Sequence, residues 1–503
     1  MTLAPSLIVG LPVVLPLLLG ALSLAFWRSH ATQRFLGVAG SALLLLLSVQ
    51  LLLDTWEHGH LVMEMGAWPA PFGIVLVSDM LAAIMVVLTG IIGLATALYS
   101  LAGIGIRHER FGYYPLFHLL LAGVNGAFLT GDIFNLYVWF EVMLVASFAL
   151  LILGGERAQM EGAIKYVTLN LLSSALFLTA IGLLYGLTGT LNMADLAVKL
   201  GEVEDTGLVT VIAMLFMVAF GIKAAAFPFF FWLPASYHTP KVAVSALFAG
   251  LLTKVGVYSL FRVFTLIFNQ EVGHTHEILL WVAMLTMLTG VLGAAAQYEF
   301  RRILSFHIVS QIGYMILGLA LFTPLAIVGG VFYIMHHIIV KANLFLISGL
   351  TYQLKGSHEL RELGGLYRSH PMLAVLFMVP ALSLAGLPPL SGFFAKFIII
   401  RAGIEVEAWL AVAVALIVGL LTLYSMVKIW NEVFWKAQPA GGAGPQVAQG
   451  SLVWMWIPIV GLALMTVMIG LYGQPIFEMA EKSAGQLLDT SGYIEAVLGG
   501  GPR

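Results

Sequence analysis

Long apolar runs separated by short polar connections repeat along the whole chain. A run of about 20 apolar residues is long enough to cross a membrane as a helix. The pattern predicts fourteen such spans, at 6–27, 35–53, 74–100, 112–130, 132–153, 164–188, 208–237, 242–268, 277–297, 303–322, 325–350, 371–403, 408–435 and 452–473. We therefore expect an all-α, polytopic membrane protein.

Two of these spans are too long for one crossing and contain proline. The span at 208–237 contains Pro228 and Pro234, and the span at 371–403 contains Pro389. Proline removes an amide donor and clashes with the carbonyl four residues earlier, so each span should split into two half-helices. The two broken spans lie five spans apart and therefore run in opposite directions. This spacing favours two inverted five-helix repeats, with sites near the membrane midplane.

This interpretation divides the chain into four parts. Residues 1–111 hold the first three helices, 112–268 the first repeat, and 269–435 the second repeat. Residues 436–503 hold a linker, the fourteenth helix and a C-terminal tail. The first apolar run is too long for a signal peptide and lacks a basic start, so we expect it to be retained as a membrane span.

The charges of the connections predict the orientation of the chain. Cytoplasmic loops are enriched in Lys and Arg. The even-numbered connections hold only Lys199 and Arg401. The odd-numbered connections hold thirteen such residues: Arg28, Arg34, Arg107, Arg110, Arg157, Lys165, Lys241, Arg301, Arg302, Lys355, Arg361, Arg368 and Lys436. Both termini are therefore expected outside the cell membrane.

Composition excludes several classes of protein. The chain of 503 residues is 60% hydrophobic and 10% charged, which is typical of a membrane protein. Its net charge of −2 gives no basic patch for nucleic acid. The absence of cysteine excludes disulfides, thiolate-ligated iron–sulfur clusters and cysteine catalysis in this chain. We expect no cofactor and no metal site.

Ionisable residues inside apolar spans are the candidate functional residues, because such groups are costly at bilayer depth. Glu141 lies nine residues beyond Asp132, which we place at the aqueous end of its helix. At 1.5 Å per residue this step puts the carboxylate roughly 13 Å into the membrane. The lysines in other spans are Lys223, Lys254, Lys341 and Lys396.

A buried carboxylate near a buried amine forms a site that can take up and release a proton, because each group can be neutral or charged. A static salt bridge is the alternative for Glu141, and a side chain that reaches the surface is the alternative for Lys223. Lys254 lies deep in its span, with no acidic residue nearby in the sequence.

A second group of candidates lies on the eleventh and twelfth spans. His337 and Lys341 are four residues apart on one helical face, with Tyr333 one turn earlier. A neutral histidine can accept and donate a proton, so His337 could relay one. A histidine that only bonds to a neighbouring carbonyl is an equally weighted alternative for His337. For His336 this structural alternative is favoured. Lys396 follows Pro389 by seven residues, near the start of a half-helix whose positive dipole end would disfavour its charged form. If the spans adjoin, the candidates form a lateral polar axis in the membrane.

Three segments carry a family resemblance. They are the run from Asn125 to Glu141, Gly221-Ile-Lys followed by Trp232-Leu-Pro-Ala-Ser-Tyr-His, and Leu384-Ala-Gly-Leu-Pro-Pro-Leu-Ser-Gly-Phe-Phe-Ala-Lys. Together they resemble the antiporter-like family shared by the proton-pumping membrane subunits of respiratory complex I and the Mrp Na⁺/H⁺ antiporters. The closest form is the D subunit of the Mrp antiporters, and the similarity covers nearly the whole chain.

The resemblance implies roles for the buried residues. A glutamate and a lysine form a coupled pair, and further lysines or histidines carry the proton onward. These roles fall on Glu141, Lys223, Lys254, His337, Lys341 and Lys396. A lysine at the twelfth-span position disfavours one type of complex I subunit, which has glutamate there. The implied partners are the A, B, C, E, F and G subunits of an Mrp complex, together with membrane lipid.

The leading hypothesis is a proton-translocating subunit of a multi-subunit Na⁺(Li⁺)/H⁺ antiporter, which is a transporter subunit and not an enzyme. The first alternative is a proton-pumping subunit of complex I or a membrane-bound hydrogenase, whose polar axis would look the same. The second alternative is a membrane scaffold with static charges. Because Na⁺ prefers oxygen ligands and the buried candidates are mostly nitrogenous, we expect sodium to pass largely through a partner subunit.

Overall fold

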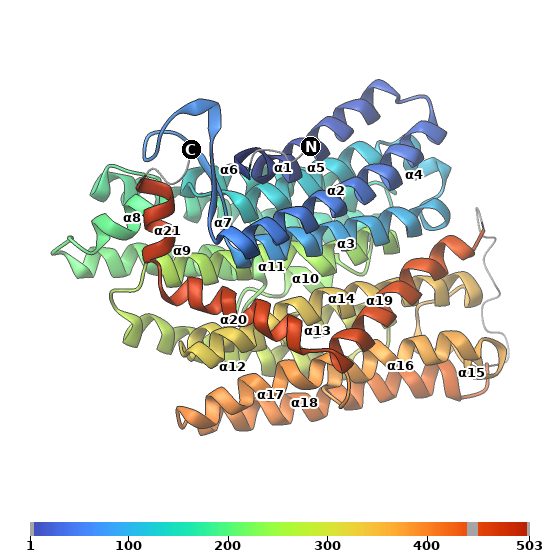
Figure 1. The fold of residues 1–503 in the computed structure, drawn as a ribbon. Coiled ribbons are helices and arrows are strands. Elements are labelled where there is room, and N and C mark those ends of the chain that lie inside the picture. Colours follow the sequence, from blue (N-terminus) through green and yellow to red (C-terminus); the bar gives the residue numbers. More distant parts are fainter. Residues whose placement is uncertain (1–4, 440–450, 500–503) are drawn as a thin grey trace.

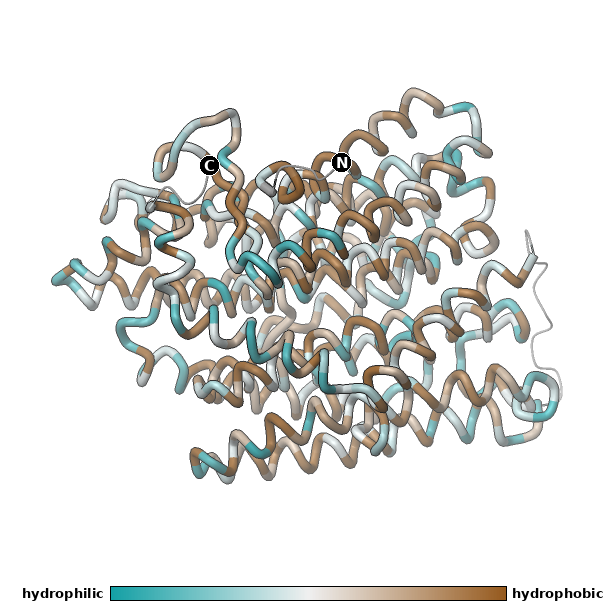
Figure 2. Tube along the Cα trace, in the orientation of Figure 1, coloured by the Kyte–Doolittle hydropathy of each residue, from teal (hydrophilic) through white to brown (hydrophobic). Residues whose placement is uncertain are grey.

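The protein is a bundle of long helices that lie side by side (Figure 1). The computed structural model describes residues 5–439 and 451–499. Within these ranges, twelve helices are long and apolar enough to cross a membrane, and two shorter apolar helices lie at Tyr113–Leu129 and Pro371–Ala385. Hydrophobic residues cover most of the length of the bundle (Figure 2). The predicted all-α, polytopic fold is confirmed.

The crossings follow one another in chain order. They are α1 (Pro5–Ala25), α2 (His30–His58), α3 (Met80–Gly103), α5 (Tyr113–Leu129), α6 (Ile133–Leu151), α7 (Arg157–Thr188), α9 (Thr206–Ala224) with α10 (Trp232–Ser236), α11 (Val242–Leu266), α12 (Val272–Ala296), α13 (Phe300–Ala320), α14 (Pro324–Lys355), α16 (Pro371–Ala385) with α17 (Ser391–Glu405), α18 (Trp409–Ile429) and α19 (Val453–Leu471). Short helices form α4 (Ile106–Arg110), α8 (Met193–Leu200), α15 (Leu366–Ser369), α20 (Gln474–Leu488) and α21 (Ser491–Leu498). This order matches the fourteen predicted spans.

The third crossing begins later than predicted. The sequence pattern placed its start at residue 74, but Val75–Ser78 forms strand β2, which pairs antiparallel with β1 (Leu61–Glu64). Helix α3 begins after Asp79, whose carboxylate accepts a hydrogen bond from the Ala82 amide at 2.9 Å. Such a cap satisfies an amide that has no partner within the helix. Val75, Leu76 and Val77 of β2 are apolar and buried, so the hydropathy pattern joined them to the helix.

In the first broken crossing, the half-helix α9 ends before Pro228 and Pro234. Helix α9 stops at Ala224, and Ala225 takes a left-handed conformation with φ of 60°. Neighbouring side chains satisfy the freed backbone groups: the Phe227 amide donates to Thr286 Oγ1 at 2.9 Å, and the Trp232 indole donates to the Ile222 carbonyl at 3.0 Å. Irregular backbone inside a membrane protein requires such partners.

The second broken crossing consists of two half-helices of equal length, α16 and α17. Helix α16 ends at Ala385 and is followed by Gly386, which has a φ of 93°, and α17 begins at Ser391. The Gly392 amide donates to Ser383 Oγ at 3.1 Å. This break lies five crossings after the first, so the two broken crossings run in opposite directions, as predicted for inverted repeats. The residue limits assigned to the two repeats stay a prediction.

The C-terminal helices return to the bundle. The end of α19 packs closely on the second break, where a Cβ on Gly470 would lie 2.2 Å from the Pro389 carbonyl oxygen. Helix α20 then runs along α14, α3 and α11 (Figure 1). Gln486 on α20 accepts a hydrogen bond from the Met80 amide at 2.8 Å. The predicted tail therefore contains a packed helical segment, with polar residues recurring along it (Figure 2).

Candidate functional site

Glu141 on α6 and Lys223 on α9 meet at a serine of α7. The Ser174 hydroxyl donates to Glu141 Oε1, and Lys223 Nζ donates to Ser174 Oγ at 3.0 Å. A longer contact joins Lys223 Nζ to the Asn170 carbonyl at 3.4 Å. The ion pairs of the described residues do not include Glu141 with Lys223. The two ionisable groups are therefore linked through Ser174.

The surroundings of Lys223 suit an amine that gains and loses charge. Its side chain lies in the last turn of α9, where the unpaired helix carbonyls carry partial negative charge. The amine lies 5.1 Å from the centre of the Phe140 ring. A cavity of about 20 Å³ beside it is lined by Asn170 and, on α11, by Leu252. That volume accommodates about one water molecule.

Lys254 is fully buried in the middle of α11. Its amine donates to the Ala249 carbonyl of its own helix. The hydroxyl of Thr253 beside it is also buried and has no hydrogen-bond partner within the described protein. The described ion pairs contain no partner for Lys254. The Lys254 amine is therefore bound by a backbone carbonyl and not by a carboxylate of the described residues.

His337 and Lys341 lie on the central helix α14 and are both fully buried. Both ring nitrogens of His337 and the amine of Lys341 lack hydrogen-bond partners among the described protein atoms. The same holds for both ring nitrogens of His307 on α13. Buried polar atoms in proteins are almost always paired with protein or water. This cluster is therefore suited to internal water.

Lys396 lies at the second break. Its amine donates to the Ala385 carbonyl, the last residue of α16, at 3.0 Å and lies 5.0 Å from the centre of the Tyr314 ring. The expectation that a positive helix end governs this lysine is wrong, because the side chain folds back onto the negative C-terminal end of α16. His336 bonds to Ser391 at the same break, with Nδ1 and Oγ 2.8 Å apart.

The helices that carry the six predicted residues adjoin one another. Helix α6 contacts α7, α7 contacts α9, α9 contacts α11, α11 contacts α14, and α14 contacts α17. The candidates therefore follow a path across the bundle. Direct hydrogen bonds link Glu141, Ser174 and Lys223, whereas the amines of Lys254 and Lys396 donate to backbone carbonyls.

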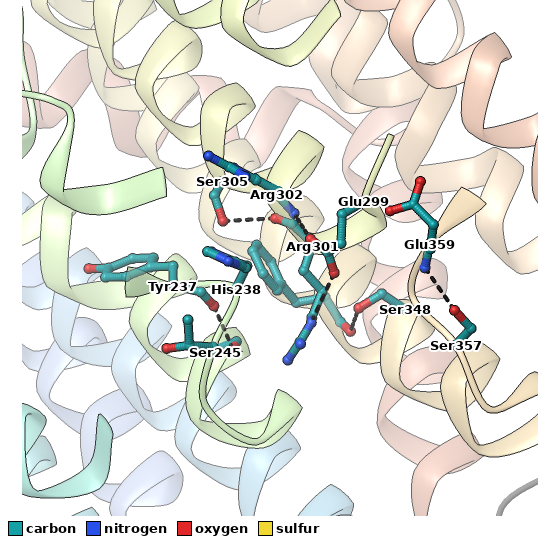
Figure 3. A network of polar contacts seen from close by, with 12 residues as sticks. Tyr237, His238, Ser245, Glu299, Arg301, Arg302, Ser305, Ser348, Ser357 and Glu359 are labelled. Atoms are coloured by element: carbon teal, nitrogen blue, oxygen red, sulfur yellow. Dashed lines mark hydrogen bonds and ion pairs between the residues drawn. The ribbon is translucent and has the colours of Figure 1, made fainter. Parts of the chain in front are cut away.

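A network of polar contacts surrounds Glu299 and Arg301, at the start of α13, and includes His238 and Glu359 (Figure 3). Glu299 accepts from the Arg302 amide at 2.5 Å, and Arg301 donates to the Pro240 carbonyl at 2.8 Å. Burial, together with the charge of Arg301, lowers the pKa of His238 to about 4. Burial likewise lowers the pKa of His358. Both histidines are therefore neutral at physiological pH.

A cavity of about 140 Å³ lies beside this network. Its lining includes Lys241, Arg301, His358 and, on α14, Gly349. Gly349 lies eight residues from Lys341 on the same helix, a rise of about 12 Å. A polar cavity therefore lies within about two helical turns of Lys341 along α14.

A buried ion pair occupies the opposite end of α11. Arg262 Nη1 lies 2.6 Å from Asp79 Oδ2, and both side chains are almost fully buried. The guanidinium also lies 5.3 Å from the ring of Tyr493 on α21. Lys254, Tyr258 and Arg262 follow one another at four-residue intervals along α11. The Arg262 contacts therefore join the C-terminal segment to the bundle.

Comparison with known proteins identifies the family of the chain. The model of the family described as NADH:quinone oxidoreductase/Mrp antiporter, transmembrane region, matches residues 130–422, which include all six candidates. The chain belongs to this family. A curated relative from Alkalihalophilus pseudofirmus, the D subunit of a Na⁺/H⁺ antiporter, is 48% identical over 491 residues, 98% of this chain and 99% of the relative.

Similar solved structures have the same fold. A chain of the Mrp complex from Dietzia sp. DQ12-45-1b matches with a TM-score of 0.91 and 34% identity, covering 99% of this chain and 100% of that one. A chain of respiratory complex I from Thermus thermophilus matches with a TM-score of 0.80 and 27% identity, covering 95% and 99%. The resemblance inferred from the three sequence segments is confirmed.

Several polar contacts near the candidates could not be predicted from the sequence. Ser174 gave no signal, because a serine in a membrane helix commonly bonds to its own backbone. His336, for which a bond to a neighbouring carbonyl was favoured, contacts the second break through Ser391. Asp79 and Arg262 lie within the predicted spans 74–100 and 242–268, which are far apart in the chain, so their partnership was hidden. Among the described residues, no cluster of three or more histidine or acidic side chains could hold a metal ion.

Proposed function

We propose that this chain is the proton-carrying subunit of a multi-subunit antiporter that exchanges H⁺ for Na⁺ or Li⁺. The observation that carries the proposal is the 48% identity to the D subunit of a Na⁺/H⁺ antiporter across nearly the full length of both chains. The match to a chain of the Mrp complex supports the same assignment. The identity to the complex I chain is lower, at 27%, which favours the antiporter over the redox-driven alternative.

The proton route begins at Glu141 and Lys223. A proton shared across Ser174 leaves the pair either charged on both sides or neutral on both sides, so the site can switch. Lys254, His337 and Lys341 then carry the proton through the centre of the bundle, and Lys396 receives it at the second break. The support for this order is the contact between the successive helices that carry these residues.

Water completes the route where side chains do not touch. The unpaired atoms of His337 and Lys341 require hydrogen-bond partners, and the cavity beside Lys223 has room for about one water molecule. The polar cavity near Gly349 supplies a connection to the end of the bundle that we place in the cytoplasm. A neutral histidine can relay a proton through its two nitrogens.

Sodium takes a different route in this proposal. The central candidates are amines and imidazoles, whereas Na⁺ prefers oxygen ligands, so sodium passes largely through the partner subunits. The proposed partners are the A, B, C, E, F and G subunits of an Mrp complex. The chain lies in the cell membrane with both termini outside.

The test uses the complete set of antiporter subunits, expressed in cells that lack their own Na⁺/H⁺ antiporters. Everted vesicles are acidified internally by respiration, and NaCl or LiCl is then added. We expect the ΔpH to collapse in vesicles with the full complex and to persist when this subunit is omitted. A full complex that leaves the ΔpH unchanged upon addition of either salt would contradict the proposed function.

A further inference from the structure

Ser174 occupies an unusual position for a serine in a helix of this protein. The buried serines Ser41, Ser48 and Ser259 each donate to the carbonyl four residues earlier in their own helix. Ser174 donates instead to the carboxylate of Glu141, on another helix. The carbonyl four residues before it, that of Asn170, receives Lys223. The hydroxyl is thereby free to face the two ionisable groups.

We propose that the Ser174 hydroxyl is the bridge through which the proton moves between Lys223 and Glu141. This inference rests on the proposed function and adds a residue that carries the proton in one of its steps. Ser174 Oγ accepts from Lys223 Nζ at 3.0 Å and donates its own proton to Glu141 Oε1. A hydroxyl has one donor and two acceptor sites, so it can hold both bonds at once.

The transfer balances without any further reactant. An N–H bond of the Lys223 ammonium breaks while its proton forms an O–H bond with Ser174 Oγ. The original O–H bond of Ser174 breaks, and that proton bonds to Glu141. The serine ends as a neutral hydroxyl, Lys223 becomes a neutral amine, and Glu141 becomes a neutral acid. The reverse transfer restores both charges.

The packing around Ser174 leaves Lys223 few other partners for proton transfer. Ser174 is only 4% exposed, and Lys223 is 6% exposed. Removal of the hydroxyl leaves Lys223 with the longer contact to the Asn170 carbonyl. The neighbouring cavity has room for about one water molecule, so a slow route through water remains.

The adjacent serine offers a matched control. Ser173 is fully buried on the same helix, and its hydroxyl donates to the Ala219 carbonyl of α9 at 2.7 Å. Ser173→Ala therefore removes an interhelical hydrogen bond of the same kind without touching either ionisable group. Ser174→Thr keeps a hydroxyl at the bridging position.

The experiment measures Na⁺-dependent proton exchange in everted vesicles, with assembly of the complex checked on native gels. We expect Ser174→Ala to lower the maximal rate about tenfold or more, with the half-saturating Na⁺ concentration unchanged. Ser173→Ala should exchange at the rate of the unaltered complex, and Ser174→Thr should recover most of the rate. If Ser174→Ala fails to assemble, the nearly isosteric Ser174→Cys replaces it, with the same expected loss, because a thiol is a weak donor and acceptor.

Two results separate this inference from the proposed function. An assembled Ser174→Ala or Ser174→Cys complex with an undiminished maximal rate would overturn the bridge, provided that Glu141→Gln abolishes exchange. An equal loss in Ser173→Ala and Ser174→Ala would also overturn it, since packing alone would then explain both. Undiminished exchange in assembled Glu141→Gln complexes would instead overturn the proposed function.

Discussion

The buried amines of this protein differ in what they touch. Lys223 contacts a hydroxyl that leads to a carboxylate, and Lys396 contacts a helix-end carbonyl and an aromatic ring. Lys341 is fully buried and has no partner among the described protein atoms. A buried polar group without a protein partner costs stability. A lysine at such a position indicates a role other than holding helices together.

This view predicts that Lys341→Met separates transport from stability. Methionine has a similar length and no polar group, so the midpoint of thermal unfolding of the complex should be unchanged or higher. Na⁺-dependent exchange should fall about tenfold or more, since a proton site is lost. Lys355→Met, at the exposed end of the same helix, is the control and should leave exchange intact. Lower stability with undiminished exchange would instead favour a static role.

For single residues, the sequence could identify the ionisable candidates but not the contacts that they make. Glu141 and the lysines stand out because charge is rare in apolar spans. Ser174 is chemically ordinary in a membrane helix, and only its position between α6 and α9 reveals its contacts. His336 and His337 are adjacent in the chain, so their different surroundings depend on how α14 is rotated within the bundle.

The broken helices depend on their neighbours for backbone partners. The Phe227 amide, freed by the end of α9, donates to Thr286 of α12. The Trp232 indole donates to the Ile222 carbonyl at the same break. These bonds fix the position of Lys223, two residues before the left-handed Ala225.

We therefore predict that Thr286→Val destabilises the first break. The threonine is fully buried, and its loss leaves the Phe227 amide without that acceptor, at a cost of about 1–3 kcal/mol. Thr289→Val is the matched control, because Thr289 lies on the same helix and bonds only to backbone carbonyls of α12. Thermal unfolding of the purified complex should show a lower midpoint for Thr286→Val only. Equal midpoints for the two variants would contradict the assigned partner.

The sequence predicted which segments form helices, but it predicted less well the residues at which the helices end. Proline correctly marked both broken crossings, but α9 ends at Ala224, four residues before Pro228, and Pro234 lies inside α10. Proline is tolerated in the first turn of a helix, so Pro234 does not cause the break. Strand β2 was missed because its apolar residues raise hydropathy as helix residues do, and its partner β1 lies in the predicted connection.

Across the whole molecule, polar groups run through the bundle and gather at its two ends. The cavity beside Arg301 and His358 lies at one end, and the Asp79–Arg262 pair lies at the other. Lys254 and Arg262 share a face of α11, and the Asp79 carboxylate neutralises the charge of Arg262. The pair therefore places no net charge between the central lysine and that end of the bundle.

The orientation of the bundle can be tested because the chain contains no cysteine. The loop charges predict that the connection at Gly59 and the residues near 501, which lie outside the described ranges, face outward, and that Gly356 faces inward. Both glycines have positive φ, so we choose their exposed neighbours. A membrane-impermeant thiol reagent should label Glu57→Cys on whole cells and Glu362→Cys only in everted vesicles. Labelling of Glu362→Cys on whole cells would contradict the orientation.

The decisive measurement for proton transfer at Glu141 is Na⁺-dependent exchange by Glu141→Gln in everted vesicles, with assembly checked on native gels. Glutamine keeps the volume of the side chain and can still accept from Ser174, but it cannot take up the transferred proton. Glu202→Gln, at an exposed charge, is the control. Glu141→Asp should keep part of the activity, because the carboxylate remains, drawn back by about one methylene.

We predict that exchange by Glu141→Gln falls far more than the abundance of the assembled complex, while Glu202→Gln exchanges normally. A loss of assembly instead would favour the static scaffold. Unimpaired exchange in assembled Glu141→Gln complexes would contradict the central claim that a proton passes through this carboxylate.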